Sequence, residues 1–554
     1  MRFGTVDLFI DMSEWSFRMG RPVVNEEFLK ALLLYGSYDE YHFFCPDINS
    51  MEIFKNRLQD IIPDPKCLPR VNVSLQIALS ETLKEKEFHI FHMGDFTRYM
   101  PSMIWMRNKF SVKPFPITGT THSLDDISMN VDYLRLMFSG IKKFDRIICT
   151  SKTAQNTIKK RFQYLKIRLS SISKSNFLDD LIPYTSLIPL GIGEDFFEEV
   201  DRNYAKDFLN IPKDKVVMLS VGRYSLRSKA DWSPLLETLS YRLNHEMLDN
   251  FLFIIAGGAT EEEIKLMESM LSIFKLRDYV ILFPNFKPEV KRILYAASDI
   301  FISIVDNFQE TFGLNILEAM ASGLPIIASD FNGYRDHIED GRNGFLIPTY
   351  FTGEIPEFLE ENFPILNPSI RRLYMSQLIS HNMEYLWGKI KLLMENQGLR
   401  AEMGKESKRI ARRYGWKEII KRYEDLWKEL LEECKGLKDD TAFFSDIYID
   451  YAESKIFNHY TTEIINDECR VGITAYGQEL YRLKILPLIY EDINVSLFKE
   501  LLSLLMESVY RNQICSIKEL KDIAYRELEA TYRQTLFHIQ YLLKHGVFYL
   551  DGKR

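Results

Sequence analysis

The hydrophobic pattern between residues 216 and 348 alternates short apolar runs with longer amphipathic stretches. Five of the apolar runs predict strands: VVMLSV (216–221), FLFIIA (251–256), VILF (280–283), IFISIV (300–305) and LPIIAS (324–329). These runs lack a polar alternation, so both faces of each strand are expected to be buried. Buried strands separated by helices indicate a parallel sheet that helices cover on both sides.

Two helices in this region begin with recognisable capping residues. Ser233 followed by Pro234 predicts an N-cap and a first helical position. Thr260 with Glu263 predicts a capping box that opens a helix ending near Phe274. The region therefore predicts a doubly wound domain of the nucleotide-binding type.

The first 190 residues show a less regular form of the same pattern. Strands are expected at residues 4–10, 89–93, 116–120 and 146–150, and helices at residues 26–35 and 151–165. A second α/β domain explains this alternation most simply. The segment TSLIPLGIGEDFF (185–197), with one proline and two glycines, is predicted to be the hinge between the two domains.

The pattern becomes helical after residue 350. YGWKEIIKRYEDLWKELLEE (414–433) predicts a long amphipathic helix, because its aromatic, Leu and Ile positions recur at helical spacing. Farther on, FHIQYLLKHGVFYL (537–550) predicts a helix, a glycine stop and a short strand. That order is typical of a small winged-helix or helical-bundle module.

Composition and charge narrow the class of protein. The 554 residues are 46% hydrophobic and 27% charged, which excludes a disordered or collagen-like chain. The net charge of −8 argues against a surface that binds nucleic acid throughout, and no nucleic-acid partner is expected. The six cysteines are scattered without a C-x-x-C pair, which favours free thiols in a reducing compartment.

The chain carries no segment that predicts membrane insertion. Its first apolar stretch is too short for a signal peptide, and no run of 18 uncharged apolar residues occurs, so a cytoplasmic location is expected. Residues 151–174 contain seven Lys and Arg and no acidic residue. Such a basic helix can contact the inner face of an anionic membrane peripherally or hold an anionic acceptor, and it can equally be a solvated helix near a phosphate pocket.

The segment 306–348 carries the most informative chemistry. Glu310 lies on a predicted loop, a helix is predicted to begin near Gly313, and Glu318 follows about one and a half turns later. The amides of Phe312, Gly313 and Leu314 at this helix start favour an anion such as a diphosphate. Ionised Glu310 and Glu318 can accept hydrogen bonds from sugar and ribose hydroxyls. Two glutamates alone would more simply be a solvated loop residue and a surface ion pair.

Two cations in the same predicted domain favour a ligand-binding role for Glu310 and Glu318. Arg223 and Lys229 lie in VGRYSLRSKAD (221–231), directly after a buried strand. Ligands of open α/β sheets bind at the carboxyl ends of the strands, so both cations can neutralise a pyrophosphate there. An Arg and a Lys in a loop would otherwise be expected to contact only solvent.

Together these segments resemble the retaining GT-B glycosyltransferases grouped as glycosyltransferase family 4. The resemblance covers about residues 1–433 and is strongest over 185–348. The family's paired glutamates, with seven residues between them, match Glu310 and Glu318, and its Gly-Leu-Pro turn matches 323–325. The resemblance implies that Glu310 holds the donor sugar and that Glu318 binds the ribose.

The family's conserved cations have counterparts here as well. Its arginine and lysine match Arg223 and Lys229, and the resemblance implies that both grip the diphosphate. The family usually has a glycine after that lysine, whereas this chain has Ala230 and Asp231, a local variation of the loop.

The resemblance also assigns residues of the first domain. It implies that His122, in TTHS (120–123), is a catalytic residue beside the reacting sugar, where it can donate to the sugar or phosphate. His92 is a second candidate, but its place inside a predicted strand favours a structural role. Gly20 matches a phosphate-contacting loop, although the family commonly has two adjacent glycines there.

The fold class that follows is α/β of the GT-B type, with two Rossmann-like doubly wound domains facing a cleft. Four parts are expected: an acceptor-side domain (1–190), a nucleotide-sugar-binding domain (191–410), a helix crossing back to the first domain (411–435) and a helical accessory module (436–554). The helix is assigned by resemblance, Trp416 included.

No metal or other cofactor is expected beyond the nucleotide-diphosphate sugar. The nearest carboxylate pair is Asp125-Asp126, which lacks supporting ligands and is predicted to lie in a solvated loop. Neither a G-x-G-x-x-G after the first strand nor a P-loop is present. Cations and helix amides can replace a metal at the leaving diphosphate, as the resemblance implies.

The function expected from these features is transfer of a sugar from a nucleotide-diphosphate sugar to an acceptor hydroxyl with retention of configuration. The acceptor class stays open between a glycan, a lipid-linked glycan and a protein. Alternatives are a sugar phosphorylase or epimerase of the same fold, and an inactive nucleotide-sugar-binding scaffold. A DNA-binding role for residues 436–554 is less favoured than acceptor or protein recognition, because that segment mixes acidic and basic residues.

Overall fold

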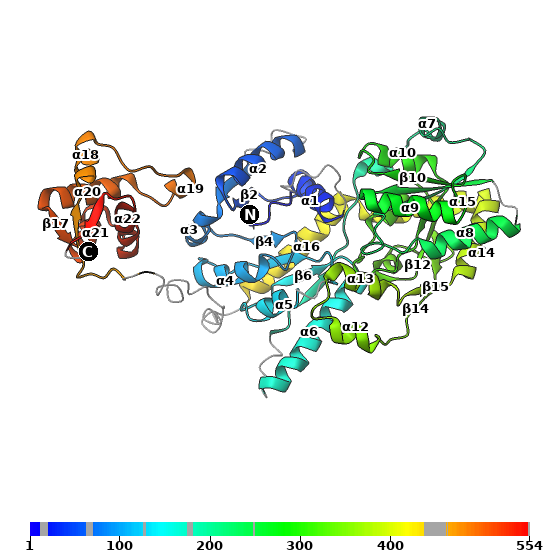
Figure 1. Ribbon diagram of the computed structural model, residues 1–554, viewed down its shortest axis with the longest axis horizontal. Coiled ribbons are helices and arrows are strands. Elements are labelled where there is room, and N and C mark those ends of the chain that lie inside the picture. Colours follow the sequence, from blue (N-terminus) through cyan, green and yellow to red (C-terminus); the bar gives the residue numbers. More distant parts are fainter. Residues whose placement is uncertain are drawn as a thin grey trace. The chain divides into compact units, whose positions relative to one another are not determined.

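The computed structural model describes residues 1–10, 20–62, 70–125, 129–173, 181–246, 250–436, 461 and 464–551. The chain divides into two compact units, Met1–Pro46 with Ser50–Tyr448, and Asp47–Asn49 with Ile449–Arg554. The first unit contains two parallel sheets with helices around them, and the second contains helices with a small antiparallel sheet (Figure 1). Within the described residues, no helix is long and apolar enough to cross a lipid bilayer.

Seven parallel strands form the sheet of the first domain, in the order β3-β2-β1-β4-β5-β6-β7. The strands are β1 (Arg2–Thr5), β2 (Glu40–Cys45), β3 (Val71–Leu75), β4 (Ile90–Met93), β5 (Ile117–Thr120), β6 (Arg146–Cys149) and β7 (Thr185–Leu187). Its helices are α1 (Arg21–Tyr35), α2 (Ile48–Ile61), α3 (Leu79–Glu85), α4 (Met100–Phe110), α5 (Met129–Met137) and α6 (Lys152–Ser173). The strand order reverses between β1 and β4, which is the topological switch point of this sheet.

The first domain differs from the sequence prediction at both ends. β1 ends at Thr5, because the Thr5 hydroxyl accepts from the Asp7 amide and the Asp7 carboxylate accepts from the Phe9 amide. These two contacts turn the chain where the prediction continued the strand to residue 10. At the other end, β7 pairs with β6, so the first residues of the predicted hinge at 185–197 belong to the sheet.

Six parallel strands form the sheet of the second domain, in the order β10-β9-β8-β11-β12-β13. They are β8 (Val216–Val221), β9 (Phe251–Gly257), β10 (Val280–Pro284), β11 (Ile300–Ser303), β12 (Ile326–Ser329) and β13 (Gly344–Ile347). Helices α7 (Arg202–Phe208), α8 (Ser233–Glu246), α9 (Glu261–Ile273), α10 (Val290–Ala297), α11 (Leu314–Ala321), α14 (Met383–Glu395) and α15 (Gln397–Ala411) accompany this sheet. Its switch point lies between β8 and β11.

Of the two capping predictions in the second domain, one is confirmed and the other names the wrong capping residue. The capping box of Thr260 and Glu263 opens α9 and is confirmed. At the start of α8, the amide and hydroxyl of Ser233 both donate to the Asp231 carboxylate, at 2.9 and 2.6 Å. Asp231 therefore supplies the capping acceptor that the sequence prediction gave to Ser233.

Between the second sheet and α14 the chain makes an excursion that the sequence did not predict in detail. It leaves at β14 (Thr349–Tyr350), forms α12 (Glu357–Asn362) and α13 (Pro368–Ser376), and returns at β15 (Ser380–His381). β14 and β15 pair with each other in antiparallel fashion, which joins the two ends of the segment. We call residues 351–379 the excursion.

The long helix α16 (Trp416–Lys435) follows α15 and packs against the first sheet. The Trp427 indole donates to the Thr118 hydroxyl at 3.1 Å, and the hydroxyls of Tyr423 and Thr120 lie 3.1 Å apart. Trp427 and Tyr423 are both fully buried. The chain thus returns to the first domain after completing the second (Figure 1).

The second unit has its own hydrophobic core. Strands β16 (Arg470–Ile473), β17 (Ile514–Ser516) and β18 (Phe548–Leu550) form an antiparallel sheet in the order β17-β16-β18. Its helices are α18 (Ala475–Leu483), α19 (Glu491–Asn494), α20 (Lys499–Asn512), α21 (Ile517–Leu528) and α22 (Tyr532–Lys544). The helix, glycine stop and strand predicted at 537–550 correspond to α22, Gly546 with φ +67° and β18.

Candidate functional site

The loop between β11 and α11 places Glu310 beside the start of a helix. Gly313 is the N-cap of α11 and has φ +92°, a conformation that favours glycine. A Cβ on Gly313 would lie 2.3 Å from the Tyr334 ring, so a side chain is also excluded by space. The Phe312 amide donates to Glu310 Oε1 at 3.3 Å, so this amide is engaged by a carboxylate that belongs to the protein.

Lys229 and Glu310 form a close ion pair at the switch point of the second sheet. Lys229 Nζ lies 2.6 Å from Glu310 Oε2, and the two side chains are 13% and 19% exposed. Burial alone would raise the pKa of Glu310, but the charge and hydrogen bond of Lys229 bring it below its usual value. Burial opposes the charge on Lys229, yet the Glu310 carboxylate raises the pKa of that ammonium. Both groups are therefore charged at neutral pH.

Arg223 lies in the same loop as Lys229, after β8. Its Nη2 donates to Gln309 Oε1 and to the Ser228 carbonyl, each at 3.3 Å. β8 and β11 are neighbours in the sheet, so the loops after them meet at one edge. The structure thus brings Arg223 and Lys229, on one loop, together with Glu310, which lies 81 residues beyond Lys229 on another loop.

Glu318 lies inside α11, buried and facing helix α10. One carboxylate oxygen is paired with Lys291, and the other accepts from the Tyr295 hydroxyl at 2.7 Å. Lys291 and Tyr295 are four residues apart on one face of α10. Sequence reasoning missed both, and the only local signal was this helical spacing.

His122 follows β5 in the first domain and touches the Glu310 loop through its backbone. Its carbonyl accepts from the Thr311 hydroxyl at 2.9 Å, so the two domains meet here. Its Nε2 lies 2.6 Å from the Gly94 carbonyl, which can only accept, so Nε2 carries the proton. Burial lowers the pKa of His122, which keeps the ring neutral. Nδ1 of the neutral ring is then an acceptor, whereas the sequence prediction had the ring donate.

Gly20 lies at the start of a helix, and His92 is packed in the core. Gly20, with φ +73°, is the N-cap of α1, and a Cβ there would meet no atom within 4 Å. The next residue, Arg21, pairs with Asp95 at 2.6 Å. The Asp95 charge raises the pKa of His122, which opposes the effect of burial. His92 is buried with Nδ1 2.9 Å from the Thr118 hydroxyl, as a structural histidine would be.

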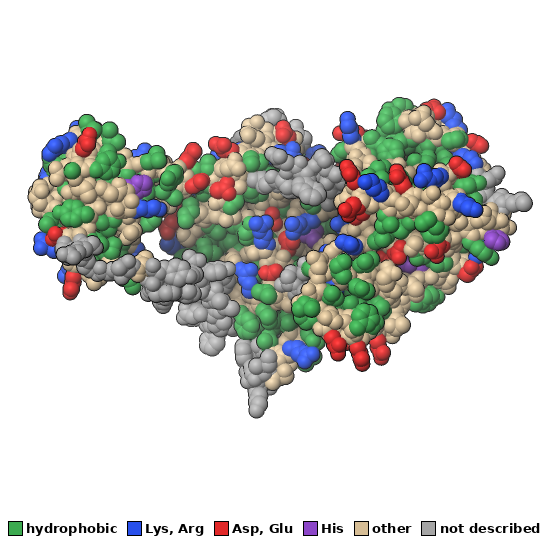
Figure 2. Space-filling model, viewed as in Figure 1, with side chains coloured by type: hydrophobic (Ala, Val, Ile, Leu, Met, Phe, Trp, Pro, Cys, Tyr) green, Lys and Arg blue, Asp and Glu red, His purple; other side chains and the backbone are tan. Residues whose placement is uncertain are grey.

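A second acid that the sequence analysis missed lies near Glu318. Glu27, on α1, accepts a hydrogen bond from the Trp416 indole at 2.9 Å. The pKa of Glu27 is raised to about 7, chiefly by burial and also by the Glu318 charge, while the Trp416 hydrogen bond and the Lys291 charge oppose the rise. Charged side chains of both signs line the hollow between the two α/β domains in Figure 2. No local pattern marks Glu27, because it is one of two adjacent glutamates on an ordinary helix.

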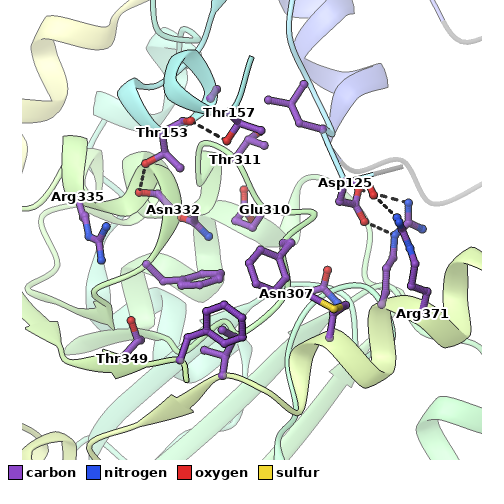
Figure 3. Close-up of a pocket in the computed structure, with 18 of the residues that line it drawn as sticks. Asp125, Thr153, Thr157, Asn307, Glu310, Thr311, Asn332, Arg335, Thr349 and Arg371 are labelled. Atoms are coloured by element: carbon purple, nitrogen blue, oxygen red, sulfur yellow. Dashed lines mark hydrogen bonds and ion pairs between the residues drawn. The ribbon is translucent and has the colours of Figure 1, made fainter. Parts of the chain in front are cut away.

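A cavity of about 580 Å³ lies beside Glu310 (Figure 3). Its wall is formed by α6, the Glu310 loop, the segment after β12 and the excursion. Asp125 also lines it and pairs with Arg372 of the excursion, whose Nη2 lies 3.4 Å from Oδ1. This corrects the prediction of a solvated loop for Asp125, while Asp126 falls outside the described residues. Across the described part of the chain, no group of three or more His, Cys, Asp or Glu is arranged to hold a metal ion.

Comparison with known proteins identifies the second domain. Residues 201–366 match the family model for glycosyl transferases group 1. The chain carries a glycosyl transferases group 1 domain.

A D-inositol 3-phosphate glycosyltransferase of Acidothermus cellulolyticus is 26% identical over 208 residues, which cover 36% of this chain and 44% of that protein. The GtfA subunit of a UDP-N-acetylglucosamine–peptide N-acetylglucosaminyltransferase of Streptococcus gordonii is 22% identical over 322 residues, covering 58% of this chain and 50% of the subunit. The chain thus spans half or less of the length of these curated relatives.

Solved structures extend the likeness to both α/β domains. Sucrose-phosphate synthase from Thermosynechococcus elongatus matches with a TM-score of 0.50 and 18% identity, covering 78% of this chain and 99% of that one. Anabaena HepE, solved in complex with UDP, matches with a TM-score of 0.52 and 16% identity, covering 77% of this chain and 100% of that one. These likenesses confirm the predicted GT-B fold with its two Rossmann-like domains.

Proposed function

We propose that this protein transfers a glycosyl unit from a nucleotide-diphosphate sugar to an acceptor hydroxyl with retention of configuration. The observation that carries the proposal is the ion pair of Lys229 and Glu310, with Arg223 beside it, at the switch point of the second sheet. Ligands of open α/β sheets bind at such switch points. A cationic pair and an acceptor carboxylate suit the diphosphate and the sugar of the same donor.

In this proposal, Arg223 and Lys229 neutralise the diphosphate and the charge that grows as it departs. Preformed positive groups stabilise developing charge without a cost of reorganisation. The start of α11 at Gly313 adds its helix dipole through the Leu314 amide, whereas the amides of Phe312 and Gly313 bind the Glu310 carboxylate. Glu310, held ionised by Lys229, accepts hydrogen bonds from the hydroxyls of the donor sugar.

Glu318 is assigned to the ribose of the donor. One of its oxygens binds Lys291 and the other binds the Tyr295 hydroxyl, and each keeps a second lone pair for a ribose hydroxyl. Lys291 also compensates the charge of this buried carboxylate. Lys291 and Tyr295 are positioning residues in this scheme.

The transfer step breaks the bond from the anomeric carbon to the phosphate oxygen and forms a bond to the acceptor oxygen on the same face. The acceptor's hydroxyl proton passes to the departing phosphate, which leaves as the nucleoside diphosphate. His122, adjoining the Glu310 loop, accepts a hydrogen bond at Nδ1 from the sugar or the acceptor. Closure of the two domains keeps water from the reacting sugar.

A panel of nucleotide sugars, scored by thermal stabilisation, tests the proposal. UDP-sugars come first, because the HepE structure contains UDP and the Streptococcus gordonii relative is named for UDP-N-acetylglucosamine. A donor at ~100 times its dissociation constant adds about 2.7 kcal/mol of stability. Lys229→Ala and Glu318→Ala should abolish the response, while Lys265→Ala, at an exposed site on α9, should keep it. Equal responses from all three variants would place the donor site elsewhere.

Product analysis separates transfer from the other reactions of this fold. A transferase gives a new glycoside only when an acceptor is present, whereas an epimerase changes the nucleotide sugar without one. Nuclear magnetic resonance of the product then reports the anomeric configuration, and an inverted product would contradict the retention proposed here.

A further inference from the structure

The cavity beside Glu310 is separate from the residues assigned to the diphosphate and ribose. Glu310 lines it, whereas Arg223, Lys229 and Glu318 do not. Building on the proposed function, we propose that this cavity is the acceptor subsite and that it binds a saccharide whose reacting hydroxyl points to Glu310. The volume of about 580 Å³ lies within the range of small-molecule sites.

Aromatic side chains form much of the cavity wall. The rings of Phe308 and Phe331 meet edge to face with centroids 5.5 Å apart. Tyr350, Phe351 and Phe363 complete the wall from the side of the excursion. The flat C–H faces of sugar rings pack on aromatic rings, while their hydroxyls point sideways to polar groups. An apolar wall with a few polar groups therefore fits a saccharide.

One buried polar group in the wall has an unused donor. Asn332 is 7% exposed, and its Oδ1 accepts from the Tyr334 amide at 3.1 Å. Its Nδ2 is buried and has no hydrogen-bond partner among the described residues. The Thr153 hydroxyl of α6 donates to the Asn332 carbonyl at 2.9 Å, which holds this residue from the first domain (Figure 3). A hydroxyl or ring oxygen of a bound sugar would satisfy Nδ2.

The charges around the cavity argue against a phosphorylated ligand. Arg335 donates to the Asp330 carboxylate at 2.5 Å, and Arg161 donates to the Leu124 carbonyl at 2.8 Å. Arg372 is paired with Asp125. Arg335 and Arg372 are thus paired with carboxylates, so an anion that approached either of them would have to compete with the protein's own acceptors. A neutral ligand rich in hydroxyls would bind without displacing these acceptors.

Glu310 connects the cavity to the donor side. One oxygen of this carboxylate binds Lys229, while the residue also borders the cavity. A hydroxyl held in the cavity is thus adjacent to the sugar that Glu310 would hold. The walls come from α6 of the first domain and from the excursion of the second, so both domains shape the site.

The direct test is ligand binding by saturation-transfer nuclear magnetic resonance on the full chain. The probes are p-nitrophenyl glycosides of common hexoses and disaccharides, with a serine- and threonine-rich peptide as the competing class. Asn332→Asp removes the free donor but keeps the Oδ1 acceptor, and Phe363→Ala removes part of the wall. Phe358→Ala is the matched control, because Phe358 is 60% exposed on α12 and does not line the cavity.

We expect at least one glycoside to bind, and both cavity variants to weaken its binding about five- to tenfold. The Phe358→Ala control should stay within about twofold of the unaltered protein, and melting curves should show all three variants folded. The inference fails if no glycoside binds, if binding survives both cavity variants, or if the peptide binds in its place.

Kinetics distinguish this failure from that of the proposed function. The proposed function fails if no nucleotide sugar binds or is hydrolysed. The saccharide site would still be supported in that case if a glycoside binds the unaltered protein and both cavity variants lose that binding. We expect Asn332→Asp and Phe363→Ala to hydrolyse the nucleotide sugar without acceptor as the unaltered protein does. A KM for the glycoside that is raised about five- to tenfold in these variants then supports the inference. An unchanged KM in both variants overturns it.

Discussion

At the scale of single residues, the candidate site depends on partners that are distant in sequence. Lys229 and Glu310 are 81 residues apart, and Lys291 and Glu318 are 27 apart. Lys229 and Glu310 could be predicted, because they lie in loops after strands and match a family pattern, and Glu318, inside α11, could be predicted from that pattern. Lys291 and Glu27 could not, since their importance comes from tertiary contacts that a helical pattern does not report.

Gly313 gives a stability prediction at this scale. Gly313→Ala should lower the free energy of unfolding by about 2 kcal/mol or more, because the residue needs a positive φ and its Cβ would meet the Tyr334 ring. Gly341→Ala is the matched control, with φ +76° and no atom near its Cβ. Urea unfolding measures both. Equal losses in the two variants would mean that the Tyr334 contact adds nothing to the backbone strain.

Glu27 gives a prediction of pH dependence. Its pKa is raised from 4.5 to about 7, so the folded state binds the proton more tightly than the unfolded state does. Stability from this group is therefore complete below pH 4.5 and is lost as the pH rises toward about 7. Glu27→Gln keeps the oxygen that accepts from Trp416 but cannot ionise.

The variant should therefore melt close to the unaltered protein at pH 5 and above it at pH 8, where ionised Glu27 faces the Glu318 carboxylate. Differential scanning calorimetry across that interval measures the gap. A gap that stays constant with pH would contradict the raised pKa of Glu27.

At the scale of elements, the sequence predicted buried strands better than exposed ones. β8, β9 and β11 are continuous apolar runs that are almost wholly buried, so their positions were clear. β10 is an apolar run as well, but it lies at the sheet edge and only Val280 is buried, so the expected burial of both its faces was wrong. β3 (VNVSL) is an edge strand whose five residues all keep some exposure, and its Asn72 and Ser74 conceal the strand pattern. The excursion was also missed, because its helices bury few side chains and show only short apolar runs.

Helix α16 carries a prediction about packing between elements. Trp427 is 1% exposed, packs on Phe3 with ring centroids 5.6 Å apart, and donates to Thr118. Trp427→Ala should lower the free energy of unfolding by about 3–5 kcal/mol, as large cavities in cores do. Lys428→Ala, on the exposed face of the same helix, should change it by less than about 0.5 kcal/mol. A loss below about 1 kcal/mol for Trp427→Ala would mean that α16 does not depend on this contact.

At the scale of the whole molecule, the donor residues all belong to the first compact unit. The second unit has a separate core, so its removal leaves the contacts of the donor residues intact. A chain ending at residue 436 should keep the thermal response to the nucleotide sugar that stabilises the full chain. Loss of the response in a folded truncated chain would show that the second unit takes part in donor binding.

The same truncation addresses the role of the second unit in acceptor recognition. If that unit recognises the acceptor, transfer to a native acceptor should fall while donor hydrolysis continues. Transfer that stays unchanged would exclude this role. The sequence predicted helices and the last strand, β18, for this unit, but not β16 and β17, which are only four and three residues long.

The most direct test of the donor site is a crystal structure of the protein with the nucleotide diphosphate that stabilises it best. We expect the diphosphate within hydrogen-bonding distance of Lys229 and Arg223, with the ribose hydroxyls on Glu318. A nucleotide bound elsewhere, with the Lys229–Glu310 pair unoccupied, would contradict the proposed donor site.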